Sequence, residues 1–326
     1  MSSQRRTALI TGATGFVGTH LVSRLLAEHW DVHIVVRPQV HAQALGRMVG
    51  IHEYDGHIDS LLTAMAESQP DVVFHVASFF TANHGTSDVE PMIESNILFG
   101  AHLLEAMWVY GIKNLVNVGS YWQHYNDSDY DPACLYAATK QAFEALLTYY
   151  ANARNISAIT LKLFDTYGPN DPRPKLLQLL YSAAIEGRRL EMSPGEQQLS
   201  FVYVDDVIDA FMIAADRMSH GLVAGIEAYT VDANVPLRLR DLVETFSKVT
   251  GRNLDVEWGA QPYRPRQVMV PYSRGIRLPG WSPKVSFEEG LRRLNSSGND
   301  SESLRCPPSK ALFQYSKELQ PNPQGS

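Results

Sequence analysis

Short runs of β-branched and apolar residues alternate with longer stretches of helical period through the first half of the chain. The strand-like runs are residues 7–11, 31–36, 72–76, 114–118 and 158–163, and the helix-like stretches are residues 17–28, 58–67, 91–110 and 136–153. The third run, Val-Val-Phe-His-Val, is apolar almost throughout, as expected of a strand covered by helices on both faces. The alternation predicts an α/β fold of the Rossmann type, with a doubly wound parallel sheet.

The rhythm changes after Gly168. Turn-rich segments at 169–174 and 193–195 interrupt helices that we expect at 175–185 and 239–250. We therefore predict a cofactor-binding Rossmann domain over residues 1–168, to which later segments such as 199–232 return. A smaller mixed α/β substrate-binding lobe is predicted for residues 169–293. Residues 294–326 are polar and of low complexity, which predicts a disordered tail.

Composition and charge exclude several classes of partner. A formal net charge of -7 provides no concentrated basic face, which argues against nucleic acid as a partner. The two cysteines, Cys134 and Cys306, lie too far apart in sequence to indicate a disulfide framework or a metal knuckle, so we expect no metal and a reducing cytoplasm. No apolar signal core precedes the first strand, and no apolar run approaches roughly 20 residues, so neither secretion nor a membrane partner is expected.

A glycine-rich turn occupies the first junction between strand and helix, where residues 11–18 read Thr-Gly-Ala-Thr-Gly-Phe-Val-Gly. Glycines keep such a turn tight and let the N–H groups of a helix N-terminus approach a pyrophosphate, while Gly18 allows the helix to pack closely on the strand. A purely structural turn is the alternative. At this position the motif predicts a dinucleotide site.

The end of the second strand distinguishes between the two nicotinamide cofactors. NAD sites usually place an acidic residue there for the ribose 2′-hydroxyl, whereas an arginine can bind the 2′-phosphate of NADP. Here Val36 stands at the acidic position and Arg37 follows it. This favours NADP(H) over the alternative that Arg37 is a solvated loop residue.

Tyr136 and Lys140 begin a predicted helix four residues apart, so they share one face. An ammonium next to a phenol favours the phenolate, and we expect it to lower the pKa of Tyr136 toward the range of a useful proton donor. Ser120, at the end of the fifth strand, could hydrogen-bond the substrate oxygen. The alternatives are that Ser120 caps a turn, or that its neighbour Tyr121 takes this position in the site. We predict Ser120, Tyr136 and Lys140 as the catalytic residues.

The GxxGxxG turn, the Tyr-x-x-x-Lys pair and the segment 201–207, Phe-Val-Tyr-Val-Asp-Asp-Val, together resemble the extended short-chain dehydrogenase/reductase family over about residues 7–290. The resemblance implies that the fourth-strand stretch runs beneath the cofactor and that His57 takes the place of an acidic residue near the adenine. The cofactor-binding residues that it implies are Gly12, Thr14, Gly15, Phe16, Val17, Gly18, Arg37, His57, Ile58, Val76, Ala77, Ser78, Asn96, Lys140 and Leu163.

The rest of the chain is similar to the subgroup of CDP- or dTDP-sugar 4-ketoreductases. The loop after Ser120 is rich in aromatic residues, which indicates either a packed loop or a wall for a sugar, and it lacks the Asp-Glu pair of the 4,6-dehydratases. Arg264 and Arg266 fall where the family binds a diphosphate, although surface solubility is an alternative. The predicted substrate-binding residues are Phe79, Tyr121, Gln123, His124, Asp165, Arg173, Lys175, Arg264 and Arg266.

These features predict an NADP(H)-dependent reductase of a 4-keto-6-deoxy nucleotide sugar, with Tyr136 as the general acid. The resemblance also implies a homodimer. Three alternatives remain open at this point: a nucleotide-sugar epimerase that retains its cofactor, a reductase of small aldehydes or ketones, and a dinucleotide-binding regulator without catalytic activity.

Overall fold

A seven-stranded parallel sheet forms the centre of the protein. The computed structural model describes residues 5–38 and 48–297 of the chain. The strand order is β11-β6-β5-β4-β1-β2-β3, and every neighbouring pair is parallel. The strands are β1 (Thr7–Thr11), β2 (Asp31–Val36), β3 (Val49–Glu53), β4 (Val72–His75), β5 (Asn114–Ser120), β6 (Ser157–Leu163) and β11 (Ile226–Val231). The predicted doubly wound Rossmann-type sheet is confirmed.

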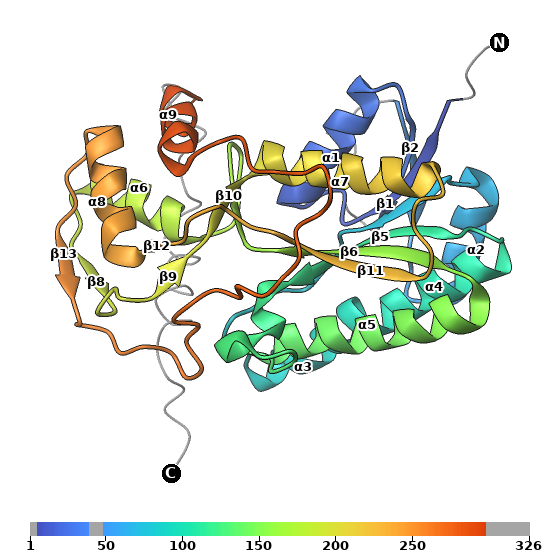
Figure 1. Cartoon of the computed structure of the whole chain (residues 1–326), viewed down its shortest axis with the longest axis horizontal. Coiled ribbons are helices and arrows are strands. Elements are labelled where there is room, and N and C mark those ends of the chain that lie inside the picture. The colour runs from blue at the N-terminus through green and yellow to red at the C-terminus, as the bar shows by residue number, and fades with distance from the viewer. Residues whose placement is uncertain (1–4, 39–47, 298–326) are drawn as a thin grey trace.

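Helices cover both faces of this sheet (Figure 1). One face packs on α1 (Phe16–Ala27) and α7 (Val204–Ser219), and the other on α2 (Ile58–Ser68), α4 (Phe99–Val109) and α5 (Leu135–Arg154). The two cores therefore divide alternate residues of each strand. In β1, for example, Ile10 belongs to the α1 side and Leu9 to the α4 side, and both are fully buried.

Helix α4 is entered through an irregular segment. Helix α3 (Thr86–Ile93) runs into a π-helical turn, η2 (Glu94–Leu98), and only then into α4, so the single helix predicted for residues 91–110 is wrong in its start and in its regularity. Two short 3-10 turns, η3 (Tyr121–Gln123) and η4 (Tyr125–Asp127), follow β5. Single π-helical turns often occur at functional sites.

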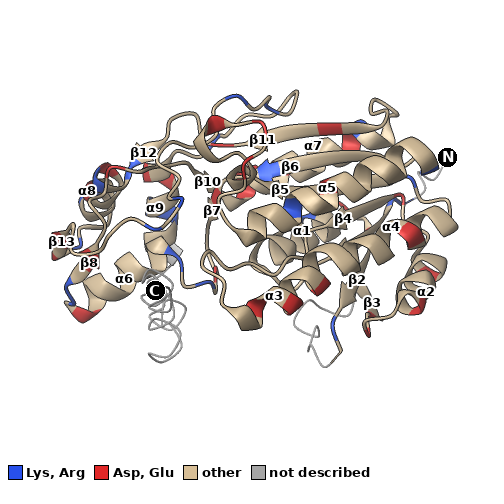
Figure 2. Cartoon of the chain, turned by 90° about the horizontal axis from the view of Figure 1, so that it is seen from below, with Lys and Arg blue, Asp and Glu red and all other residues tan. Residues whose placement is uncertain are grey.

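The remaining elements form a smaller lobe at one end of the sheet, and acidic and basic residues occur on both parts (Figures 1 and 2). Its short strands pair two by two: β7 with β10 and β8 with β13 in parallel, and β9 with β12 antiparallel. The elements are β7 (Asp165–Tyr167), α6 (Leu176–Glu186), β8 (Leu190–Met192), β9 (Gln198–Leu199), β10 (Phe201–Tyr203), β12 (Leu237–Arg238), α8 (Leu239–Thr250), β13 (Val256–Trp258) and α9 (Phe287–Ser297).

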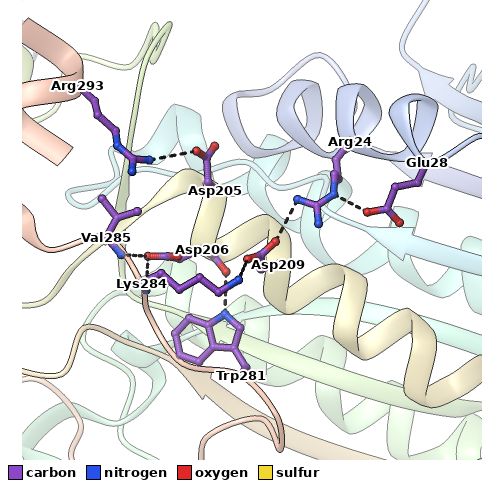
Figure 3. A network of polar contacts seen from close by, with 9 residues as sticks. All are labelled: Arg24, Glu28, Asp205, Asp206, Asp209, Trp281, Lys284, Val285 and Arg293. Atoms are coloured by element: carbon purple, nitrogen blue, oxygen red, sulfur yellow. Dashed lines mark hydrogen bonds and ion pairs between the residues drawn. The ribbon is translucent and has the colours of Figure 1, made fainter. Parts of the chain in front are cut away.

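Asp206, near the start of α7, binds the segment before α9 to this helix (Figure 3). Its carboxylate accepts hydrogen bonds from the backbone N–H groups of Lys284 and Val285, at 3.0 and 2.9 Å, and its carbonyl oxygen accepts one from the indole of Trp281. Asp209, one turn later, pairs with Arg24 of α1 and with Lys284. Two helices and the C-terminal segment thus share one polar network.

The predicted tail begins too early. Helix α9 continues to Ser297, and Leu294 is buried against the core. Leu291 and Leu294 are three residues apart, so one face of the last helical turns packs inward although the sequence around them is polar. The rest of the predicted tail lies outside the described residues.

Candidate active site

A cleft of about 980 Å³ runs along the C-terminal ends of the main strands. Its wall contains the residue at or just after the end of five strands: Gly12 after β1, Arg37 after β2, Val76 after β4, Ser120 of β5 and Leu163 of β6. Strand order reverses at β1, and in open α/β sheets ligands bind in the crevice outside such a switch point.

The glycine turn forms one side of this cleft. Gly12 has a φ of +72°, and a Cβ there would lie 2.6 Å from the backbone nitrogen of Ala77. A Cβ at Gly18 would collide with the carbonyl oxygen of Gly12. Helix α1 begins without a side-chain cap and without an acidic residue in its first turn. Its N-terminal N–H groups therefore face the cleft in a setting suited to a phosphate.

The outer end of the cleft differs from the prediction. Arg37 lines it, but His57 and Ile58 do not. His57 is the exposed N-cap residue of α2, so the chain has already left the cleft at that point. Tyr54, Asp55 and Gly56, which follow β3, form the wall instead. The Tyr54 ring packs on Phe99 with centroids 4.6 Å apart, and its hydroxyl lies 2.9 Å from Nδ1 of His102.

Tyr136 lies in the same wall, in the first turn of α5. Burial raises the pKa of its hydroxyl above the ordinary value, and the hydrogen-bonding hydroxyl of Ser78 works in the opposite direction. The expected lowering of this pKa by Lys140 is wrong for this structure, because removal from water penalises the phenolate more than the surrounding groups favour it. Tyr136 is therefore held as a neutral phenol.

Lys140 lies one helical turn behind Tyr136, with its amine 5.9 Å from the centre of the tyrosine ring. It is buried and does not itself line the cleft. Burial lowers the pKa of Lys140 to about 8, while the carboxylate of Glu144 raises it. The amine thus remains mostly protonated at pH 7 and places a positive charge near Tyr136.

Ser120 caps a turn and lies in the wall of the cleft. Its hydroxyl oxygen accepts a hydrogen bond of 3.3 Å from the N–H of Trp122, which caps the turn η3, and the residue also lines the cleft. Tyr121 lines it as well. The Tyr121 hydroxyl donates a 3.0 Å hydrogen bond to the carboxylate of Asp165, and its ring stacks on Phe164 with centroids 4.4 Å apart.

Gln123 and His124, predicted to bind substrate, point into the protein instead. The side chain of Gln123 is fully buried; it accepts a hydrogen bond from the N–H of Ser120 and donates to Gln141 and Glu144. His124 stacks on Tyr272. A polar loop side chain can turn inward where buried hydrogen-bond partners are available. For Gln123 these partners satisfy both the oxygen and the nitrogen of its amide.

Asn96 is also absent from the wall. Its side-chain oxygen accepts from the N–H of Phe79 at 2.7 Å, and its amide donates to the carbonyl of Phe79 at 2.9 Å and to the hydroxyl of Thr139 at 2.9 Å. It is buried in the π-helical turn η2. Asn96 therefore shapes the chain at Phe79, which does line the cleft, from behind.

Four predicted cations separate into two pairs. Arg173 and Lys175 line the cleft. Arg173 pairs with Asp171 at 2.7 Å, and burial lowers the pKa of Lys175 to about 8. Arg264 and Arg266 are not in the wall; Arg266 pairs with Asp131 and Arg264 lies over the Trp122 ring at 5.4 Å. The ion pair with the Asp131 carboxylate holds Arg266 outside the cleft wall.

Seven more of the residues predicted to bind the cofactor line the same cleft, namely Thr14, Gly15, Phe16, Val17, Gly18, Ala77 and Ser78. The wall also contains Phe80, which was not predicted, and Trp122 of the aromatic loop that was considered as a wall for a sugar. The only sequence signal for Phe80 was its neighbour, the predicted Phe79.

Comparisons with known proteins agree with this geometry. The family model described as the NAD dependent epimerase/dehydratase family matches residues 8–226. A CDP-abequose synthase of Yersinia pseudotuberculosis is 26% identical over 81% of this chain and 90% of its own length. A UDP-glucose 4-epimerase of Mycolicibacterium smegmatis is 28% identical over 87% and 96%. The structure of Thermus thermophilus UDP-glucose 4-epimerase with NAD is 24% identical, with a TM-score of 0.76, over 89% and 98%.

Membrane-spanning helices and metal-binding clusters were not expected in this chain. Over residues 5–38 and 48–297, none of the helices combines the length and apolar character needed to cross a membrane. Within the same ranges there is no group of three or more histidine, cysteine or acidic side chains arranged to hold a metal ion.

Proposed function

The chain belongs to the NAD-dependent epimerase/dehydratase family, an oxidoreductase-type enzyme family, and on this premise we propose that it is an NADP(H)-dependent reductase of a 4-keto-6-deoxy sugar linked to CDP or dTDP. The observation that carries the proposal is the shared cleft: the phosphate-binding end of α1 and the neutral phenol of Tyr136 lie in one wall. A cofactor held at the first would present its reactive part near the second.

The residues present fit a nicotinamide dinucleotide. Gly12 and Gly18 let the turn pack closely on the backbone of Ala77 and on itself, and the N-terminus of α1, which has no side-chain cap, could accept a pyrophosphate. Arg37 is exposed at the end of β2, next to the apolar Val36, and suits a 2′-phosphate. Tyr54 would pack against the adenosine end. These placements support NADP(H) as the cofactor.

A bound NADPH would supply the hydride, which carries two electrons to the keto carbon. Tyr136 gives its phenolic proton to the carbonyl oxygen, so that the carbonyl becomes a secondary alcohol. The charge left on the phenolate is stabilised by the ammonium of Lys140 and by the Ser78 hydroxyl, and the phenolate then regains a proton from water. Ser120, at the C-terminal end of β5, orients the carbonyl oxygen.

The cations at the other end of the cleft support a diphosphate-linked substrate. Arg173 and Lys175 provide positive charge beside Asp165 and Tyr121, and Arg264 approaches the same region. The match to CDP-abequose synthase supports a CDP-linked sugar. We also expect the protein to form a homodimer in the cytoplasm.

The second candidate is a nucleotide-sugar epimerase, favoured by the likeness to UDP-glucose 4-epimerases. Both activities would use Tyr136 and a nicotinamide dinucleotide. They differ in the overall balance, because a reductase consumes NADPH with each turnover while an epimerase regenerates its cofactor.

Consumption of NADPH tests the proposal. CDP- and dTDP-4-keto-6-deoxyglucose are generated in place by their dehydratases, and the loss of NADPH absorbance is followed with the wild-type protein and with Tyr136→Phe. We expect oxidation with one of the two sugars, and a rate for Tyr136→Phe lower on the order of 100-fold or more with NADPH binding intact. No oxidation with either sugar, together with interconversion of UDP-glucose and UDP-galactose, would replace the reductase by the epimerase.

A further inference from the structure

We propose that Phe80, supported by Trp122, forms the subsite for the deoxygenated carbon of the sugar and makes the enzyme prefer a 6-deoxy sugar over its 6-hydroxyl counterpart. The inference rests on the proposed function and names the residues that select its substrate. Phe80 was not among the residues predicted to touch substrate, whereas Trp122 belongs to the aromatic loop that was considered as a wall for the sugar.

Three aromatic rings meet at the part of the cleft where the proton is transferred. The Phe80 ring stands edge-on to Tyr136, with centroids 4.9 Å apart and an interplanar angle of 85°. The Trp122 ring also packs on Phe80, with centroids 5.6 Å apart. All three residues line the cleft, and they come from the segments after β4, after β5 and at the start of α5. An apolar surface therefore borders the reacting hydroxyl.

Phe80 is unusual because it remains exposed. Its relative exposure is 48%, although the ring has two aromatic neighbours against which it could pack further. The amine of Lys175 lies 5.7 Å from its centre. A large aromatic surface left open inside a cleft is where a ligand's apolar surface is expected to bind.

Tyr136 has a polar and an apolar neighbour in the cleft. The Ser78 hydroxyl hydrogen-bonds the Tyr136 hydroxyl, and Phe80 brings a ring without a polar atom edge-on to the tyrosine ring. In a 4-keto hexose the reacting carbon has a hydroxyl-bearing carbon on one side and, on the other, a ring carbon that carries C6. We assign the Phe80 ring to the neighbour that carries C6, because a methyl group there is the apolar part of a 6-deoxy sugar beside the reacting carbon.

A hydroxyl group at C6 would lose hydrogen bonds to water against the Phe80 ring and gain none from it. Apolar subsites reject a substrate that merely adds a hydroxyl by about 100-fold. We therefore expect a 6-deoxy sugar to be preferred over the 6-hydroxyl sugar by a factor on the order of 100 in kcat/KM.

Matched pairs of stable alcohols test this in the direction of oxidation. The probes are CDP-6-deoxyglucose with CDP-glucose and CDP-6-deoxygalactose with CDP-galactose, plus the dTDP equivalents, each with NADP⁺. The C4 hydrogen leaves as hydride to NADP⁺ and the C4 hydroxyl proton passes to the protein. Phe80→Ala should reduce the preference from about 100-fold to less than about 10-fold, mainly by raising KM for the deoxy sugar, and Trp122→Phe should have a smaller effect.

Controls separate this role from a structural one. Tyr110→Ala removes an exposed aromatic ring at the end of α4, outside the cleft wall, and should leave the preference unchanged. Phe80→Leu keeps an apolar side chain and should retain most of the preference, and it replaces Phe80→Ala if that variant does not fold.

An equal kcat/KM for both members of each pair, or a preference that Phe80→Ala leaves intact, would overturn the subsite while leaving the reductase in place. If the wild-type protein turns over neither these sugars nor the 4-keto sugars, the reductase itself fails. The subsite is then tested by equilibrium binding of the same pairs to the protein with NADP⁺. A binding preference for the deoxy sugar of about 10-fold or more that Phe80→Ala abolishes would support the subsite. Equal binding of both members of each pair would overturn it.

Discussion

The amine of Lys162 lies 2.5 Å from Nε2 of His124, beneath the loop that carries Trp122 into the cleft. The Nδ1 atom of His124 is 3.0 Å from the carbonyl oxygen of Ser128, so Nδ1 donates there and Nε2 accepts from the amine. Burial, and then the charge of Lys162, lower the pKa of His124, which fits a neutral ring. The carboxylate of Glu144, 3.7 Å from the amine, is the counter-charge of this buried cation.

Glu144→Gln should destabilise the protein. The substitution leaves the buried Lys162 ammonium without its carboxylate, which costs on the order of 2–4 kcal/mol in the free energy of unfolding. Denaturant unfolding measures this, and the double variant Glu144→Gln/Lys162→Met should recover part of the loss because it removes the unpaired charge. A single variant as stable as the wild type would show that Lys162 is not charged in the folded state.

Reduction should slow above about pH 8. Burial holds the pKa of Lys140 at about 8, so at higher pH the amine loses the charge that stabilises the Tyr136 phenolate as the proton leaves. We expect kcat to fall toward tenfold per pH unit above that value. Lys140→Met should be slow at every pH and should lack this decline; an unchanged decline in the variant would assign it to another group.

Arg37→Ala should weaken NADPH binding more than NADH binding. A hydrogen bond to a charged group contributes about 1.5–3 kcal/mol, which corresponds to about 10- to 100-fold in the KM for NADPH. Arg189→Ala, which removes an exposed arginine paired with Glu257 in the smaller lobe, serves as the control. Equal use of NADH and NADPH by the wild-type protein would contradict the assigned cofactor.

Acid should destabilise the fold through His75. Burial, with a smaller influence of Lys140, lowers the pKa of His75 from 6.5 to about 3 in the folded protein, so below about pH 6.5 the unfolded chain binds a proton that the folded chain does not. Its contribution to stability is therefore complete above pH 6.5 and is lost progressively toward pH 3, by at most about 1.4 kcal/mol per pH unit.

The variant His75→Gln isolates this contribution. It should be less stable than the wild type at pH 8, because the 2.9 Å hydrogen bond with Thr11 is altered, but its free energy of unfolding should fall less steeply between pH 6.5 and pH 4.5. Denaturant titrations at several pH values give both slopes. Parallel slopes would mean that His75 already titrates normally in the folded protein.

The parts of the fold that local sequence determines were predicted. β1 and β2 have the predicted bounds because most of their residues are apolar and buried, and the glycine turn is recognisable because its spacing follows from backbone geometry. β3 was missed. It is an edge strand without a fully buried residue, and its sequence Val-Gly-Ile-His-Glu contains no apolar run.

The side chains of the site depended on partners far along the chain. Gln123 meets Glu144, 21 residues later, and His124 meets Lys162, 38 residues later, so nothing near these loop residues in the sequence indicates that they turn inward. Arg266 is likewise drawn to Asp131, 135 residues earlier. The neighbours of Phe80 come from the turn η3 and from the start of α5, and its exposure follows only from how these segments pack.

The edge position of β11 affects how the protein is made. The sheet receives its last strand from residues 226–231, after α6 and several strands of the smaller lobe have already been translated, and the bonds to Asp206 require residues 284 and 285. Such long-range pairings slow folding, because distant segments must meet before they gain contacts. A nascent chain that ends before residue 226 leaves the edge of β6 without β11, and one that ends before residue 284 leaves the start of α7 without its C-terminal partners. These are the surfaces that a chaperone would have to protect during synthesis.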